Sequence, residues 1–182
     1  MNINKLILTS TIGVGAFVTI TTGTALAQIQ LTNQSKLSLN GIGAVKVGMT
    51  LKQASASAGT TLVRGNGYED ACYYVTPKNK AASVSFMVTS GRIARIDVYK
   101  GSPITTIKGA KIGDTEAKIK SLYPGKIKVE PDKYVPGGHY LVFTPQDEAD
   151  KNYRLVFETD GKRVTLMRTG KLPEASYVEG CS

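Results

Sequence analysis

The amino-acid sequence predicts an α+β protein of two tandem units, each a short capped helix packed on an antiparallel sheet of three or four strands. Three short segments that each occur twice support this prediction. Because a repeated order of elements constrains an architecture more tightly than a single motif does, we expect two similar halves. The matching segments are 46–50 with 111–115, 73–77 with 141–145, and 89–92 with 159–162.

Each unit is expected to begin with one short helix. In the first unit, Thr50 suits the N-cap, Gln53 completes a capping box, and Gly59 suits the C-terminal end. Thr115 takes the capping role in the second unit, and Pro124 follows the expected helix. Helices of this length are not stable alone, so packing on a sheet must hold them in place.

Runs rich in β-branched and aromatic residues supply the strands of the predicted sheets. The dipeptides Ser90-Gly91 and Asp160-Gly161 have the composition of two-residue hairpin turns. The expected strands span 72–76, 83–89 and 92–100 in the first unit, and 139–144, 152–159 and 162–168 in the second.

Strict alternation along these strands predicts a mixed apolar and charged face, which is the candidate binding surface. A buried ion pair of Arg95 and Asp97 beneath the C-terminal tail is the favoured alternative, because charges on an apolar face need hydrogen-bonded partners. The candidate surface comprises Phe86, Ile93, Arg95, Asp97 and Tyr99 in the first unit and Arg154, Arg163 and Met167 in the second.

The first 27 residues have the pattern of a cleaved signal peptide, with Lys5 before an apolar stretch and Ala25-Leu26-Ala27 at the cleavage site. The apolar stretch is too short to span a membrane, so no transmembrane segment is expected after cleavage. The mature chain, 28–182, is expected to be a single domain in the periplasm or outside the cell. Its repeats would cover about 41–101 and 107–172, followed by a tail at 173–182.

Cys72 and Cys181 are the only cysteines, and an even count in an exported chain predicts a disulfide bond between them. A reactive or metal-binding thiol is the alternative, although neither cysteine lies in a Cys-x-x-Cys or Cys/His cluster. The bond would tie the C-terminal tail to the first unit.

The mature chain would carry 22 basic and 14 acidic side chains, a net charge of +8. This balance favours anionic partners or surfaces outside the cytoplasm, or simply keeps the protein soluble. Scattered basic residues without a zinc-finger or ribonucleoprotein motif argue against nucleic acid. His139 is the only histidine and no Gly-x-Ser-x-Gly motif occurs, so no catalytic residues, metal or cofactor are expected.

The repeated Lys-[Val/Ile]-Gly-x-Thr motif before each helix resembles the tandem helix-plus-sheet units of the secreted beta-lactamase inhibitor protein family. It also resembles the single unit of the SmpA/OmlA outer-membrane lipoproteins, and the segments 48–50, 95–97, 113–115 and 179–181 resemble an exported bacterial family of unassigned function. The resemblance covers about 41–173. This chain lacks the lipoprotein cysteine and shows no residue-by-residue match to an inhibitor contact surface.

These resemblances imply a non-enzymatic protein whose sheets or loops bind other proteins. We therefore expect an exported protein-binding or inhibitor-like module of the bacterial envelope, with an envelope or extracellular protein as its partner. A small hydrolase or ligand carrier directed at cell-wall or lipid material is the alternative.

Overall fold

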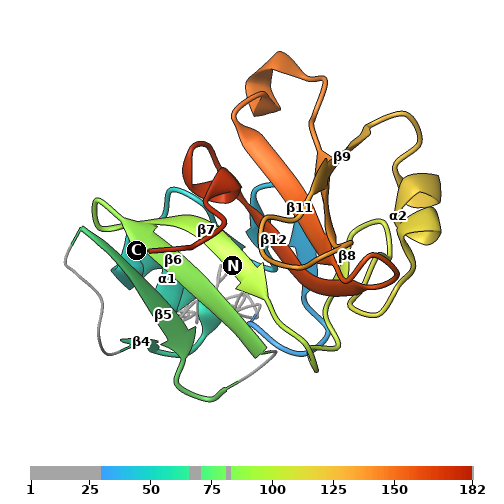
Figure 1. The fold of residues 1–182 in the computed structure, drawn as a ribbon. Helices are drawn as coiled ribbons and strands as arrows, with labels where there is room; N and C mark the ends of the chain where they lie inside the picture. Colours follow the sequence, from blue (N-terminus) through green and yellow to red (C-terminus); the bar gives the residue numbers. More distant parts are fainter. Residues whose placement is uncertain (1–29, 66–70, 81–82, 182) are drawn as a thin grey trace, which may run out of the picture.

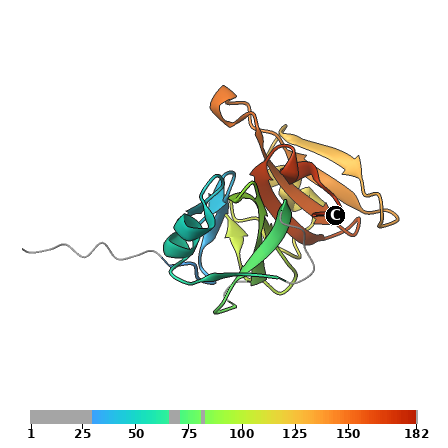
Figure 2. The same cartoon turned by 90° about the vertical axis from the view of Figure 1, so that its left-hand side faces the viewer.

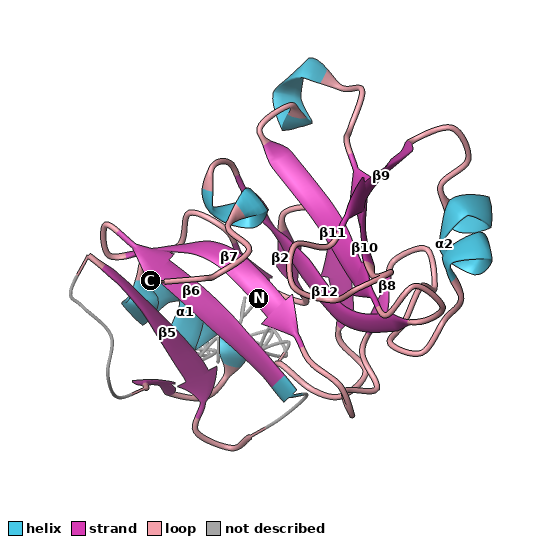
Figure 3. Ribbon diagram, viewed as in Figure 1, coloured by secondary structure: helices cyan, strands magenta, loops and turns pink. Residues whose placement is uncertain are grey.

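The computed structural model describes residues 30–65, 71–80 and 83–181, so the expected signal peptide lies outside the described residues. The fold is α+β, with two sheets and two short helices (Figure 3). The large sheet has eight antiparallel strands in the order β4-β5-β6-β7-β12-β11-β10-β9. These strands are β4 (Leu62–Arg64), β5 (Cys72–Pro77), β6 (Val84–Thr89), β7 (Arg92–Val98), β9 (Ile127–Pro131), β10 (His139–Phe143), β11 (Tyr153–Thr159) and β12 (Val164–Lys171).

The strands of the two halves join in one sheet, whereas the sequence predicted two sheets of three or four strands. The junction is the antiparallel pair β7–β12, which we call the seam, at the middle of the sheet (Figure 1). Pairing the two strands removes two exposed edges, which otherwise invite aggregation. At Gly170 the strands lie so close that an added Cβ would sit 2.5 Å from the Ala94 carbonyl oxygen.

A second, smaller sheet has the strand order β3-β2-β1-β8. Its strands are too short to give a periodic pattern, and the sequence did not predict them. They are β1 (Lys36–Ser38), β2 (Gly41–Ile42), β3 (Val45–Lys46) and β8 (Thr105–Thr106), and β8 pairs with β1 in parallel.

The capped helices were predicted correctly. In α1 (Leu51–Ala58) the Thr50 and Gln53 side chains form the capping box, and Gly59 ends the helix with a φ of 64°. Helix α2 (Glu116–Leu122) begins with the Thr115 side chain accepting a hydrogen bond from the Lys118 amide. Within the described ranges, no helix is both long and apolar enough to cross a membrane.

The repeated glycine before each helix has the same role in both halves. Gly48 donates its amide to the Ile93 carbonyl at 2.7 Å and accepts a hydrogen bond from Arg92 Nη1 at 2.8 Å. In the second half, the Gly113 amide donates to the Val164 carbonyl, and the Gly113 carbonyl accepts a hydrogen bond from Arg163 Nη1, both at 2.8 Å. The φ angles of +91° and +86° suit glycine at these turns. These hydrogen bonds therefore hold the start of each helix against the β-hairpin of the same half.

Both helices and the small sheet cover one face of the large sheet, and the C-terminal tail lies on the other (Figure 2). One buried apolar cluster contains residues of both halves. It includes Ala54 of α1, Ile119 of α2, Phe86 and Phe157 of the large sheet, and Leu37 of the small sheet, each with at most 1% of its surface exposed.

Two β-bulges overturn the side-chain faces predicted from strict alternation. The register shifts between Met87 and Val88 and again between Glu158 and Thr159. An extra residue on one strand reverses the faces of all residues beyond it, so alternation across the hairpin fails. Phe86 therefore pairs with Ile96, Val88 with Ile93, and Phe157 with Met167, all on the helix side of the sheet.

Because the seam and the buried cluster join the two halves, we predict that neither half folds alone. Fragments 28–104 and 105–182 would each expose one seam strand and part of the core, and so lose the apolar burial that offsets chain entropy. Circular dichroism should show a cooperative thermal transition for 28–182 only. A cooperative transition in either separate fragment would contradict this prediction.

Candidate functional site

The face of the large sheet opposite the helices, here called the outer face, carries most of the polar chemistry. A row of cross-strand neighbours runs over it from β6 to β9, and includes Asp97 beside Arg168 at the seam. The full row is Ser85, Asp97, Arg168, Val156, Val142 and Lys128. The outer face is therefore continuous across both halves.

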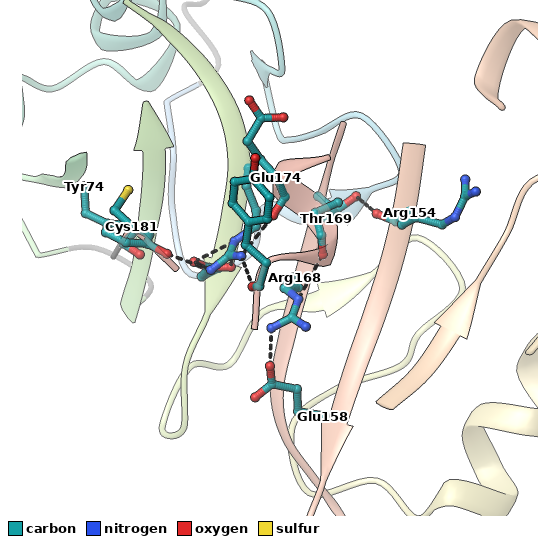
Figure 4. Close-up of polar contacts among 12 residues, drawn as sticks. Tyr74, Arg154, Glu158, Arg168, Thr169, Glu174 and Cys181 are labelled. Atoms are coloured by element: carbon teal, nitrogen blue, oxygen red, sulfur yellow. Dashed lines mark hydrogen bonds and ion pairs between the residues drawn. The ribbon is translucent and has the colours of Figure 1, made fainter. Parts of the chain in front are cut away.

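The C-terminal tail lies on the outer face at the seam, where it contacts residues of both halves (Figure 4). After β12 the chain forms the 3-10 helix η3 (Glu174–Ser176), and Ala175 within it is fully buried. Arg168 Nε donates to the Ala175 carbonyl at 3.1 Å, and Thr89 Oγ1 donates to the Glu174 carboxylate at 2.8 Å. The Cys72–Cys181 disulfide then fixes the end of the tail, as the sequence predicted.

Arg95 and Asp97 form an ion pair beneath the tail, the arrangement that the sequence favoured over an open surface. Arg95 Nε lies 2.9 Å from Asp97 Oδ1, and both side chains are at least 95% buried. Arg95 Nη1 also donates to the Glu174 and Tyr177 carbonyls, at 3.0 and 2.6 Å. One guanidinium thus neutralises the buried carboxylate and holds the tail.

Tyr74 of β5 completes this buried network, although it is not one of the residues predicted as the binding surface. Its hydroxyl accepts a hydrogen bond from Arg95 Nη2 at 2.6 Å. Burial raises the pKa of the Tyr74 phenol, and the nearby Asp97 carboxylate raises it further. Tyr74 therefore stays neutral throughout the physiological pH range.

The eight residues predicted as a binding surface do not lie together. Phe86, Ile93 and Met167 are core residues with at most 1% of their surface exposed, because the bulges turn them toward the helices. Arg95 and Asp97 lie under the tail. Arg163 donates a hydrogen bond to the Gly113 carbonyl at the turn before α2. Tyr99 is 41% exposed and shares a 2.9 Å hydrogen bond with Ser85. Arg154 lies on the part of the outer face that the tail leaves open.

The part of the outer face beside the tail forms a pocket of about 240 Å³, here called the sheet groove. Tyr140, Val156 and Arg168 are mostly buried at its base, whereas Lys128 and Thr144 are exposed. The tail forms one wall. The lining residues are Lys128, Glu130, Tyr140, Val142, Thr144, Arg154, Val156, Arg168, Ser176 and Val178.

Charges around the sheet groove are mostly paired. Glu158 accepts a hydrogen bond from Arg168, and Lys128 Nζ lies 2.9 Å from Glu130. Burial raises the pKa of the Glu158 carboxyl above its usual value, although the Arg168 charge opposes the shift. Burial and the Asp132 carboxylate raise the pKa of Tyr140 to about 12. Arg154 differs, because no acidic side chain in the described part of the chain pairs with it.

The single histidine lies away from the outer face, beside the start of α2. His139 Nδ1 is 2.8 Å from Glu116 Oε1, which also accepts a 2.6 Å hydrogen bond from Thr159. Burial alone would raise the pKa of Glu116, but these hydrogen bonds lower it below its usual value. Across residues 30–65, 71–80 and 83–181, no group of three or more His, Cys, Asp and Glu side chains could hold a metal ion.

In comparisons with known proteins, no family model and no curated protein matches the chain. Among solved structures, it is similar to a cysteine-rich secretory protein from Staphylococcus aureus subsp. aureus Mu50, with a TM-score of 0.46 and 13% sequence identity. The similarity covers 85% of this chain and 54% of the other, so this chain spans about half the length of that protein. Such a likeness identifies neither a family nor a function.

Removing the disulfide should loosen the tail. Cys72→Ser or Cys181→Ser is expected to lower the free energy of unfolding by about 2–5 kcal/mol, since the bond closes a long loop in the unfolded chain. Urea unfolding measures this change, and limited proteolysis should cut first in the tail. Reducing agent should reproduce the effect in the unsubstituted protein and leave the variants unaffected; equal stability of all forms would refute the prediction.

Replacing Arg95 should be far more costly than replacing the half-buried Arg154 of the same face. Arg95→Met leaves Asp97 buried without its counter-charge and two tail carbonyls without their donor, which we expect to cost about 3–5 kcal/mol. Arg154→Met removes no ion pair, so its cost should stay within about 1 kcal/mol. Urea unfolding of both variants checks the contrast, and similar losses would show that the buried pair is unimportant.

Proposed function

We propose that this chain is an exported, non-enzymatic protein-binding or inhibitor-like module of the bacterial envelope, periplasmic or secreted. Its partner, an envelope or extracellular protein, would dock on the open part of the outer face, at the sheet groove. One observation carries the proposal: the tail covers the outer face at the seam and leaves the neighbouring sheet groove open.

The side chains in the sheet groove suit a protein interface. Tyr140, Val142 and Val156 offer aromatic and aliphatic surface, and Lys128 and Arg154 stand at its rim. A small apolar centre with polar groups around it is the usual anatomy of a protein interface. A stable sheet also presents such groups without the entropy cost of ordering a loop.

The disulfide supports export, because such bonds persist in oxidising compartments outside the cytoplasm. We also propose that the two halves are tandem copies of one helix-on-sheet unit. The matching bonds of Gly48 and Gly113 support this view, as do the matching helix caps and bulges. The resemblance to the beta-lactamase inhibitor protein family agrees with both proposals.

A ligand carrier is the second candidate, favoured by a pocket of about 520 Å³ between the tail and the loop before β10. This volume is in the range of small-molecule sites. Its lining is largely polar and includes Lys133, Tyr177, Glu179 and the disulfide. Mass spectrometry of protein purified under native conditions should find a bound lipid or cell-wall fragment if this candidate is correct.

Site-specific cross-linking tests the binding proposal. A photoreactive phenylalanine analogue in place of Thr144, at the sheet groove, should form one discrete adduct in living cells of the organism that encodes the protein. The same analogue in place of Lys52, exposed on α1, is the matched control and should give none. The adduct should be identified and its binding reconstituted with purified partner. Identical adducts at both positions, or none at Thr144, would contradict the proposal.

A further inference from the structure

We infer that the sheet groove receives an acidic segment of the partner protein, with Arg154 as the receptor for its carboxylate. This inference rests on the proposed function and specifies the chemistry of the partner. It follows from three observations: the unused hydrogen-bond donors of Arg154, the balance of charge in the groove, and the size of the groove.

The Arg154 guanidinium is held in position by the backbone. Its Nη1 donates to the carbonyls of Lys151 and Tyr153, both at 2.7 Å. A guanidinium has five N–H donors, and within the described residues every hydrogen bond of this one is made by Nη1. The Nε and Nη2 side remains for a ligand, and it matches the two oxygens of a carboxylate. Because the group is already oriented, little side-chain entropy is lost on binding.

Arg154 is also the uncompensated charge of the groove. Two carboxylates around the groove already have a cation, since Glu130 pairs with Lys128 and Glu158 with Arg168, and a third, Asp132, interacts with Tyr140. Arg154 has no such partner among the residues that the structure describes. A guanidinium in the groove lining that no carboxylate pairs with favours an anionic ligand, and the basic balance of the whole chain adds to the attraction.

The size of the groove favours a peptide segment over a small molecule. Its volume of about 240 Å³ is below the range of about 300–1,000 Å³ that small-molecule sites occupy, but it can hold a few side chains. Val156 lies two residues from Arg154 on the same face of β11, and Val142 is the cross-strand neighbour of Val156. An extended segment with an acidic and an aliphatic residue two positions apart presents both side chains on one face, where they would meet Arg154 and the surface of Val156 and Val142.

A pair of synthetic peptides tests this chemistry. The probe is the acetylated and amidated peptide Glu-Ser-Val-Ser-Glu, which presents Glu and Val on one face when extended. Its control is Gln-Ser-Val-Ser-Gln, which has the same shape without charge. Titration into ¹⁵N-labelled mature protein should shift the amide resonances of Val142, Arg154 and Val156 with the acidic peptide, at a dissociation constant of about 1 mM or tighter. The Gln peptide should cause no saturable shift.

Two charge-reversal variants complete the test. Arg154→Glu should weaken binding of the acidic peptide by about tenfold or more, since it replaces a charged donor with a repelling carboxylate. Lys52→Glu changes the net charge equally on the opposite side of the sheet and should leave the affinity within about twofold. Matching thermal unfolding curves would show that both variants are folded.

The inference is overturned if the acidic peptide causes no saturable shift, if the Gln peptide binds equally well, or if both variants weaken binding alike. Binding to phosphatidylglycerol vesicles that depends equally on Arg154 would also overturn it, because the groove would then recognise any anionic surface. A specific adduct at Thr144 together with a negative peptide result would retain the proposed function and reject only the acidic partner. Loss of both results would reject both.

Discussion

The pairing of β7 with β12 is the constraint on which the rest of the molecule depends. Because two central strands meet there, the halves share one sheet, one buried cluster and one outer face. Gly170 permits the close approach at this seam. A single C-terminal tail covers the outer face at this seam. The Cys72–Cys181 bond and the Arg95 and Arg168 guanidinium groups secure that cover.

The tail divides the outer face into a covered part at the seam and an open part beside it. Under the tail, Arg95 and Asp97 are neutralised and hydrogen-bonded, so this chemistry stabilises the fold. Beside the tail, the same face carries Arg154 with donors still unused and aliphatic residues within reach. The tail therefore defines the limits of the proposed site as well as the stability of the protein. Ser176 and Val178 contribute directly to one wall of the sheet groove.

Local signals in the sequence predicted local structure well. Thr50, Gln53 and Gly59 specify a helix start and end through contacts within a few residues, and two cysteines allow only one bond. The candidate surface failed at Ile93 and Met167 because each lies beyond a bulge, and alternation contains no information on an inserted residue. The sheet groove was missed because it depends on β9 and on where the tail docks. Only Arg154 of the predicted set lies in it.

The register at the seam has a consequence for symmetry. Ile93 and Val164 occupy matching places in the two halves, so Asp97 corresponds to Arg168, and these two residues are direct cross-strand partners. In the proposed tandem arrangement, a pseudo-two-fold axis passes between them. In a dimer of two identical units, an isologous contact would bring the same residue from each subunit to this axis, and two like charges would repel. A chain that carries both units can differ there, and here it places opposite charges across its own axis.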